Sequence, residues 1–74
     1  MKLQYVAFME NRCTPELGEY RTYGIRLQNE NGDLLDEIAD ISSNAVAVWT
    51  LAERCTNGQL SPLHFHDVIE DYLS

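Results

Sequence analysis

The sequence contains few of the residue types on which catalysis and metal binding most often depend. Its 74 residues include two histidines and two cysteines, and neither cysteine lies in a C-x-x-C pair. It has no glycine-rich phosphate loop and no G-x-S-x-G nucleophile motif. These gaps disfavour an enzyme, and we expect no catalytic residue, no bound cofactor and no metal site.

Long apolar runs are missing as well. No stretch approaches the roughly 20 apolar residues needed to cross a bilayer, and the start, MKLQYVAFMENRC, lacks the small-residue cleavage site of a signal peptide. Two isolated cysteines do not make the disulfide framework of a secreted domain. The sequence therefore predicts a cytoplasmic protein with reduced thiols and no membrane partner.

Basic residues are scarce, with five Lys and Arg against twelve Asp and Glu, and the formal net charge is −7. Charges balance in residues 1–32, whereas residues 33–74 contain Arg54 as their one basic residue. Such an acidic half repels phosphate backbones, so direct nucleic-acid binding is disfavoured. It attracts basic protein surfaces, although acidic charge most often only keeps a small domain soluble.

The residues that are present predict one small domain over residues 1–74, because a chain of this length has room for a single core. Apolar residues make up 45% of the sequence, which is enough to exclude general disorder. Three stretches are rich in β-forming residues and predict strands: 2–10, 19–28 and 34–40.

Turn signals separate these strands. Residues 11–18 contain Thr-Pro and Gly and predict a loop. Asn31-Gly32 predicts a type I′ hairpin turn, in which both central residues have positive φ. Gly24, inside the second strand, indicates a bulge or a close approach by a neighbouring group.

Apolar residues at helical spacing over 44–55 predict a first helix. We expect Ser42 or Ser43 to cap its N-terminus, and Asn57 or Gly58 to end it in the left-handed conformation.

Ser61 and Pro62 are typical of the start of a second helix. The order β-β-β-α-α predicts an α+β fold, a three-stranded, mainly antiparallel sheet with two helices packed on one face.

The second helix holds both histidines. At about 100° per residue, His64 and His66 point about 200° apart and cannot bind one ion from this segment. We expect His66 to pair electrostatically with Glu70, four residues on. His64 lies on the other side, near Asp67 and Asp71, so these five residues form a polar cluster.

The competing hypothesis is a small metal- or thiol-dependent enzyme. It would use one of the two histidines with Asp67, Glu70 or the thiol of Cys13, which lies in the predicted loop. A catalytic zinc needs three protein ligands, and the chain has no third histidine. Cys55 falls on the apolar side of the first helix and is expected to be inert packing.

The first strand is apolar on both faces. Val6 and Phe8 share one face, and the opposite face carries Leu3, Tyr5, Ala7 and Met9. If helices cover one face only, the other apolar set faces water, which favours protein contact. Homodimerisation through the sheet or a strand edge would cover it, as would a foreign partner.

Val46 and Trp49, on the shoulder of the first helix, are a second candidate contact patch. Tryptophan is enriched at interface hot spots, although a tryptophan in a small domain more often belongs to the core.

Three motifs, TYGIRL, DIS at 40–42 and SPLHFHDVIEDYL at 61–73, resemble a family of small uncharacterised proteins from anaerobic Gram-positive bacteria, classed as a domain of unknown function. The matching positions are Tyr23, Gly24, Ile25, Asp40, Ile41, Ser42, Pro62, His64, Asp67, Val68, Ile69, Glu70 and Asp71. His66 lies outside the pattern. The resemblance implies a cytoplasmic bacterial protein with strands before helices, and it brings no activity.

The leading hypothesis is a small acidic protein-interaction or regulatory module without catalysis. Its partner would be a second copy of itself or another protein, one with a basic surface. The alternatives are the small enzyme described above and an acidic mimic that inhibits a nucleic-acid-binding protein.

Overall fold

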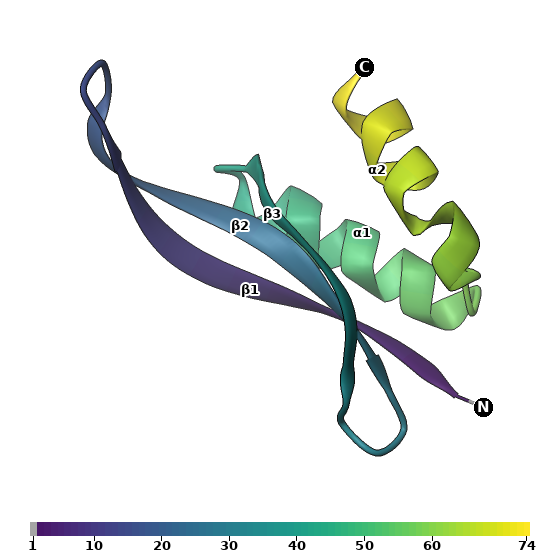
Figure 1. The fold of residues 1–74 in the computed structure, drawn as a ribbon. Coiled ribbons are helices and arrows are strands. Elements are labelled where there is room, and N and C mark those ends of the chain that lie inside the picture. Colours follow the sequence, from purple (N-terminus) through teal and green to yellow (C-terminus); the bar gives the residue numbers. More distant parts are fainter. Residues whose placement is uncertain (1) are drawn as a thin grey trace.

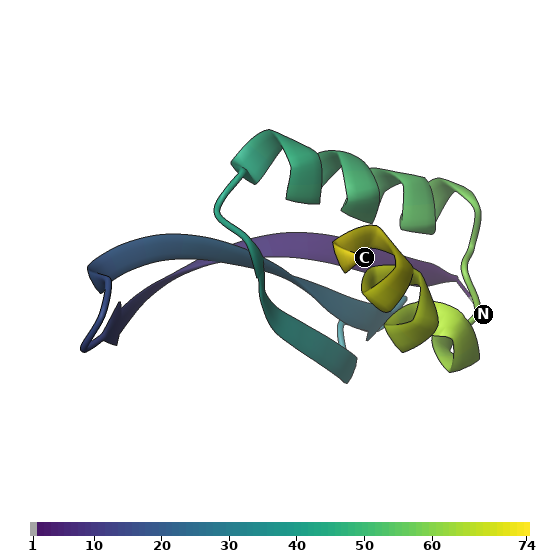
Figure 2. The ribbon, with the colours of Figure 1, turned by 90° about the horizontal axis from the view of Figure 1, so that it is seen from above.

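The computed structural model describes residues 2–74. Its elements are β1 (Leu3–Thr14), β2 (Gly18–Asn29), β3 (Leu34–Ser42), α1 (Ala45–Asn57), the 3-10 turn η1 (Pro62–His64) and α2 (Phe65–Leu73). The strands form one antiparallel sheet in the order β1-β2-β3 (Figure 1). Both helices lie on the same face of that sheet (Figure 2), so the α+β prediction is confirmed. No helix in the described part of the chain is long and apolar enough to cross a membrane.

The first hairpin is longer than predicted. Residues 11–14 are paired with residues 18–21 and belong to the strands, so the predicted loop shrinks to the turn of residues 15–17. Pro15 is accommodated there because the turn needs no ladder hydrogen bond from it, and Thr14 Oγ1 accepts from the N–H of Leu17 at 3.0 Å. Residues 9–21, called the hairpin arm below, extend past the N-terminal end of α1 (Figure 1).

The second hairpin confirms the signal at Asn31-Gly32 but not its turn type. Gly32 has a φ of +85°, whereas Asn31 is not in the positive region. The N–H of Gly32 donates to the carbonyl of Asn29 at 3.0 Å, and the Asn29 side chain accepts from the N–H groups of Asn31 and Asp33. This local side-chain bonding favours a three-residue loop with glycine in the left-handed position over a type I′ turn.

β3 contains a bulge opposite Gly24. Tyr23 pairs with Ser42 and Ile25 pairs with Ile38, so β3 has extra residues at this point. Asp40 in the bulge has a φ of +55°. A Cβ on Gly24 would collide with the carbonyl oxygen of Ile38, so the close approach expected at this glycine is confirmed together with the bulge.

The cap of α1 differs from the prediction. Asn44, and neither serine, accepts from the N–H of Ala47 at 3.1 Å, while Ser42 Oγ accepts from the N–H of Asn44 at 3.0 Å. At the other end Gly58 is right-handed and Gln59 takes the left-handed conformation, with a φ of +47°.

The start of the second helical segment agrees with the prediction. Ser61 caps it and Pro62 stands in its first turn, which is 3-10 rather than α.

The core lies between the sheet and the helices. Its buried apolar members are Leu3, Tyr5, Ala7, Ile25, Leu27, Ile41, Val48, Ala52, Cys55, Phe65 and Ile69. Phe65, with no exposed surface, meets the Tyr5 ring edge to face at 5.1 Å. The bulge turns both Ile38 and Ile41 toward the core cluster, which a regular strand cannot do with residues three apart.

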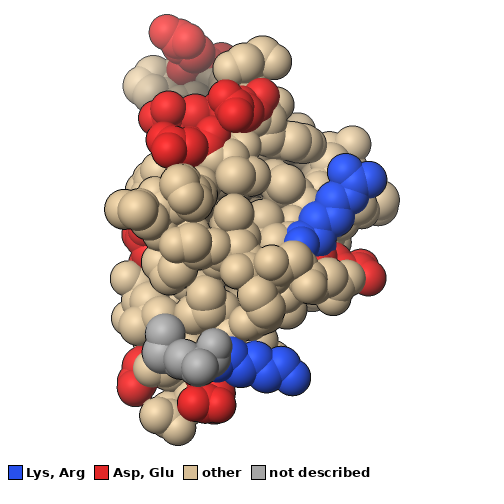
Figure 3. Space-filling model, turned by 90° about the vertical axis from the view of Figure 1, so that its right-hand side faces the viewer, with Lys and Arg blue, Asp and Glu red and all other residues tan. Residues whose placement is uncertain are grey.

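Acidic residues of the second half are exposed on α2, namely Asp67, Glu70 and Asp71. Figure 3 shows the end of the molecule near α2, with acidic side chains gathered at its upper end and a broad uncharged area in the middle.

Candidate interaction groove beside the first strand

The helices cover one face of β1 and leave the other open. Leu3, Tyr5 and Ala7 are buried under the helices, and Val6 on the opposite face is exposed. Met9 belongs to the covered face by alternation but is 52% exposed, because α1 does not reach that far along the strand. The two-faced first strand therefore has exposed apolar side chains on both sides.

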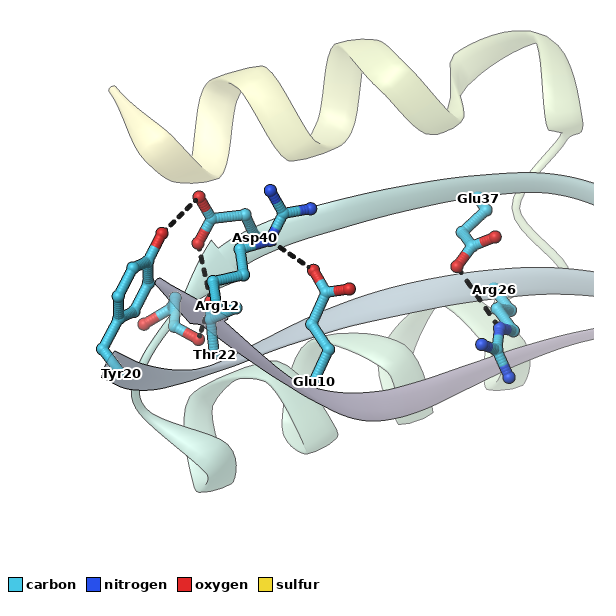
Figure 4. Close-up of polar contacts among 8 residues, drawn as sticks. Glu10, Arg12, Tyr20, Thr22, Arg26, Glu37 and Asp40 are labelled. Carbon is cyan, nitrogen blue, oxygen red and sulfur yellow. Dashed lines mark hydrogen bonds and ion pairs between the residues drawn. The ribbon is translucent and has the colours of Figure 1, made fainter. Parts of the chain in front are cut away.

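Phe8 is less available than Val6. Its ring lies against Gly24, the glycine directly opposite it on β2. The guanidinium of Arg26 lies 4.4 Å from the ring centroid. Arg26 also pairs with Glu37 of β3 at 3.4 Å (Figure 4). Phe8 thus packs within its own sheet and is only half-buried by doing so.

α1 exposes the second predicted patch. Val46 is 75% exposed and Trp49 is 57% exposed, so the expectation that a tryptophan in so small a domain lies in the core is wrong. The buried residues of α1 are Val48, Ala52 and Cys55, and Trp49 is one position round the helix from that row.

A groove brings the two patches together. It has a volume of about 350 Å³ and lies between residues 4–7 of β1 and the side of α1 formed by Trp49, Ala52, Glu53, Thr56 and Asn57. Val6 and Trp49, which are far apart in sequence, both line it. The groove is lined by apolar and aromatic side chains together with the polar residues Gln4, Thr56 and Asn57, and Glu53 is its acidic member.

β1 is an edge strand. Side chains at the C-terminal end of α1 and just after it form hydrogen bonds with the outward-facing backbone groups of its first residues. Thr56 Oγ1 accepts from the N–H of Tyr5 at 2.8 Å and lies 3.1 Å from its carbonyl oxygen. Gln59 repeats this at Leu3, since Oε1 accepts from the N–H at 2.9 Å and Nε2 donates to the carbonyl at 3.0 Å. Thr56 and Gln59 were missed by sequence reasoning, because no local pattern marks a bond to a strand so far away in sequence.

Beyond Tyr5 the edge is open. Because N–H and C=O groups alternate in direction along a strand, those of Ala7, Met9, Asn11 and Cys13 point the same way as those of Tyr5. Within residues 2–74 no strand or side chain bonds to these outer groups. An unpaired edge of this kind is a template for another strand. The unpaired part begins at Ala7, which also lines the groove.

The base of the hairpin arm is braced by a polar cluster that the sequence did not reveal. Thr22 Oγ1 donates to Asp40 Oδ1 at 2.8 Å, and the Tyr20 hydroxyl donates to Asp40 Oδ2 at 3.3 Å (Figure 4). Desolvation, and then the Asp40 carboxylate, raise the pKa of Tyr20. On the arm itself Arg12 Nε bonds Glu10 Oε1 at 2.6 Å. The bulge in β3 thereby holds the arm in place.

The predicted polar cluster lies on η1, which holds His64, and on α2, which holds the other four residues, but it is paired differently. His66 Nε2 lies 2.8 Å from Asp36 Oδ2 of β3, so the predicted pairing of His66 with Glu70 is wrong. α2 packs against β3 and gives His66 a carboxylate across the interface in place of one on its own helix. His64, Asp67, Glu70 and Asp71 are exposed.

The described residues assemble no metal site. Nowhere in residues 2–74 do three His, Cys, Asp or Glu side chains come close enough to hold an ion. Cys55 is buried, as predicted, and burial raises the pKa of its thiol. Cys13 is exposed, on β1 of the arm and not in a loop.

A family model described as "Family of unknown function (DUF6514)" matches residues 1–74, so the chain belongs to that family. Neither curated proteins nor solved structures gave a match.

Proposed function

We propose that this member of the DUF6514 family is an acidic protein-interaction module that works without catalysis, and that its contact site is the groove between β1 and α1. The observation that carries the proposal is Trp49, 57% exposed beside a free strand edge. A large aromatic side chain gains much from burial at an interface, and an open edge adds backbone hydrogen bonds for a partner strand.

The proposal includes the finer expectations of the sequence. A cytoplasmic location, an origin in an anaerobic Gram-positive bacterium and a regulatory role are parts of it that rest on composition and resemblance. The exposed acidic residues of α2 do not line the groove, where Glu53 is the one acidic side chain, so most of the negative charge lies outside the proposed contact site.

Nothing in the described part of the chain favours the enzyme hypothesis. His66 is engaged with Asp36, and among residues 2–74 no third His, Cys, Asp or Glu joins them in a group that could hold a metal ion. The acidic-mimic hypothesis would place the contact on α2 instead of the groove, and no specific contact there supports it.

A pull-down tests the proposal, with the tagged chain as bait in a lysate of its source organism. We expect a protein bound by the wild type to be lost at least about 10-fold with Trp49→Ala, the usual effect of removing a hot-spot tryptophan. Tyr72→Ala is the matched control, because Tyr72 is an exposed aromatic residue on α2, outside the groove. Equal capture by wild type and both variants, or loss with Tyr72→Ala alone, would contradict the groove as the contact site.

A further inference from the structure

We infer that the partner at the free edge is a second copy of this chain, whose β1 pairs antiparallel with the first about a two-fold axis at Asn11. The inference rests on the proposed function and names its partner. It follows from which groups of the edge are free and from the charges beside them.

The free length of the edge limits the pairing. At one end the outer groups of Tyr5 are taken by Thr56, and at the other the strand ends at Thr14. A partner strand must place its own outward-facing groups against Ala7, Met9, Asn11 and Cys13. A two-fold axis at residue 10 does this for all four residues, and an axis at residue 9 or 11 does it for three of them.

Two of these three registers are unfavourable. An axis at Met9 sets the partner's Cys13 against Tyr5, whose outer groups are already bonded to Thr56. An axis at Glu10 sets Glu10 directly against the partner's Glu10, and like charges opposite each other destabilise a sheet.

The axis at Asn11 is self-complementary. Within one chain Arg12 already bonds Glu10 at 2.6 Å. The axis sets Glu10 against the partner's Arg12 and Arg12 against the partner's Glu10, so the two intrachain pairs become one network of four alternating charges, and opposite charges at such positions stabilise the pairing. Met9 then faces the partner's Cys13, which places two exposed sulfur-containing side chains in contact distance.

The same register involves the groove. Ala7 is opposite the partner's Pro15, which has no N–H to donate, so the backbone pairing extends from Met9 to Cys13 and stops before Ala7. The partner's turn of residues 15–17 then comes to the end of the groove where Val6 and Ala7 lie. Leu17 in that turn is 71% exposed. It is the apolar side chain that the partner brings toward Trp49, and the open edge and the groove become parts of one interface.

The first test exchanges charges. Glu10→Arg and Arg12→Glu each replace two attractive cross-strand pairs with repulsive ones, and we expect each to weaken self-association about 10-fold or more. A mixture of the two variants restores both pairs between unlike chains, so it should form a heterodimer. Light scattering after size exclusion, with one variant carrying a mass tag, measures this. A monomeric wild type at every concentration, or no preference for the mixed dimer, would overturn the inference.

The second test fixes the register. In a Cys13→Ser background, Asn11→Cys places two thiols directly opposite each other, at the Cα separation of about 5.5 Å that suits a disulfide. We expect mild oxidation to link the chains through residue 11. Arg21→Cys is the control on the neighbouring strand, since Arg21 pairs with Asn11 within the arm and is also exposed. Faster linkage through residue 21 would mean that copies meet at the β2 edge and would refute the proposed pairing.

The failure of this inference and of the proposed function have different signatures. If the chain is monomeric but Trp49→Ala still abolishes capture of another protein, the groove remains the contact site and the second copy is excluded as its partner. If a dimer forms in the Asn11 register and Trp49→Ala does not weaken it, the strand pairing is supported and the groove is not part of the dimer interface.

Discussion

The two ends of β1 lie in different environments although they belong to one strand. From Leu3 to Ala7 the strand is covered by helices and its outer edge is bonded to Thr56 and Gln59. From Met9 to Thr14 it forms part of the hairpin arm, where side chains are exposed or half-buried and the outer edge is free. The same β1–β2 ladder runs through both parts.

This difference separates what stabilises the domain from what is available for contact. Apolar burial and the edge bonds are concentrated in the covered part, so changes there should affect folding. The arm is positioned by its bulge contacts but buries little, so changes there should affect association and leave folding nearly unchanged.

The largest expected effect contrasts Phe65 with Met9. Phe65→Ala removes a fully buried ring and should lower the free energy of unfolding by about 3–5 kcal/mol, which is most of the stability of a small domain. Met9→Ala in the arm should change it by less than about 0.5 kcal/mol. Urea unfolding followed by circular dichroism measures both. A loss with Met9→Ala comparable to that with Phe65→Ala would show that the arm is part of the cooperative core.

The edge bonds can be removed singly. Thr56→Val keeps the shape of the side chain but leaves the N–H and C=O of Tyr5 without their partner, which should cost about 1–3 kcal/mol. Hydrogen exchange should become faster at the Tyr5 amide and stay as it is at Asn11. Thr50→Val, at an exposed position of the same helix, is the matched control. Equal protection of Tyr5 in both variants would show that Thr56 does not close the edge.

Cys55 makes stability depend on alkaline pH. Burial raises the pKa of its thiol above the ordinary value of 9.0, so the unfolded chain loses this proton at lower pH than the folded chain. The free energy of unfolding should therefore fall as pH rises above about 9, by at most about 1.4 kcal/mol per pH unit from this group. Cys55→Ala should make the decline between pH 8 and pH 10 shallower, apart from a constant loss of packing. An unchanged slope in urea unfolding series would remove Cys55 as its cause.

The smallest effect is expected for His66 and Asp36, which connect α2 to β3 at the surface. An exposed pair of this kind contributes less than about 1 kcal/mol. A double-mutant cycle with His66→Ala and Asp36→Ala measures the coupling energy. The same cycle with Glu70→Ala in place of Asp36→Ala should give none, and a larger coupling to Glu70 would restore the helix pair that the sequence suggested.

The fold could be predicted because its signals are local. Strand propensity, the Asn31-Gly32 hairpin signal, helical spacing and the Ser61-Pro62 start each depend on neighbouring residues, and together they predict the element order. Alternation showed that β1 has two apolar faces but not which of them is buried, whereas the bulge or close approach at Gly24 followed from the glycine itself.

The features that sequence reasoning missed depend on partners distant in the chain. The loop signals at Thr14-Pro15 could not show that pairing with β2 continues past Glu10, where the predicted strand ended, as far as Thr14. His66 finds Asp36 rather than Glu70 because α2 packs on β3, and helix spacing contains no information about that packing. Trp49 is exposed beside β1, the edge strand of the sheet, and helix spacing alone does not show where that edge lies.

The edge bonds to Thr56 and Gln59 also order events in time. They join residues 51 and 56 positions apart, so during synthesis the first strand leaves the ribosome before Thr56 and Gln59 can reach it. Throughout that interval every outward amide of β1 is open to a neighbouring nascent chain. The finished domain keeps that opening only along the arm.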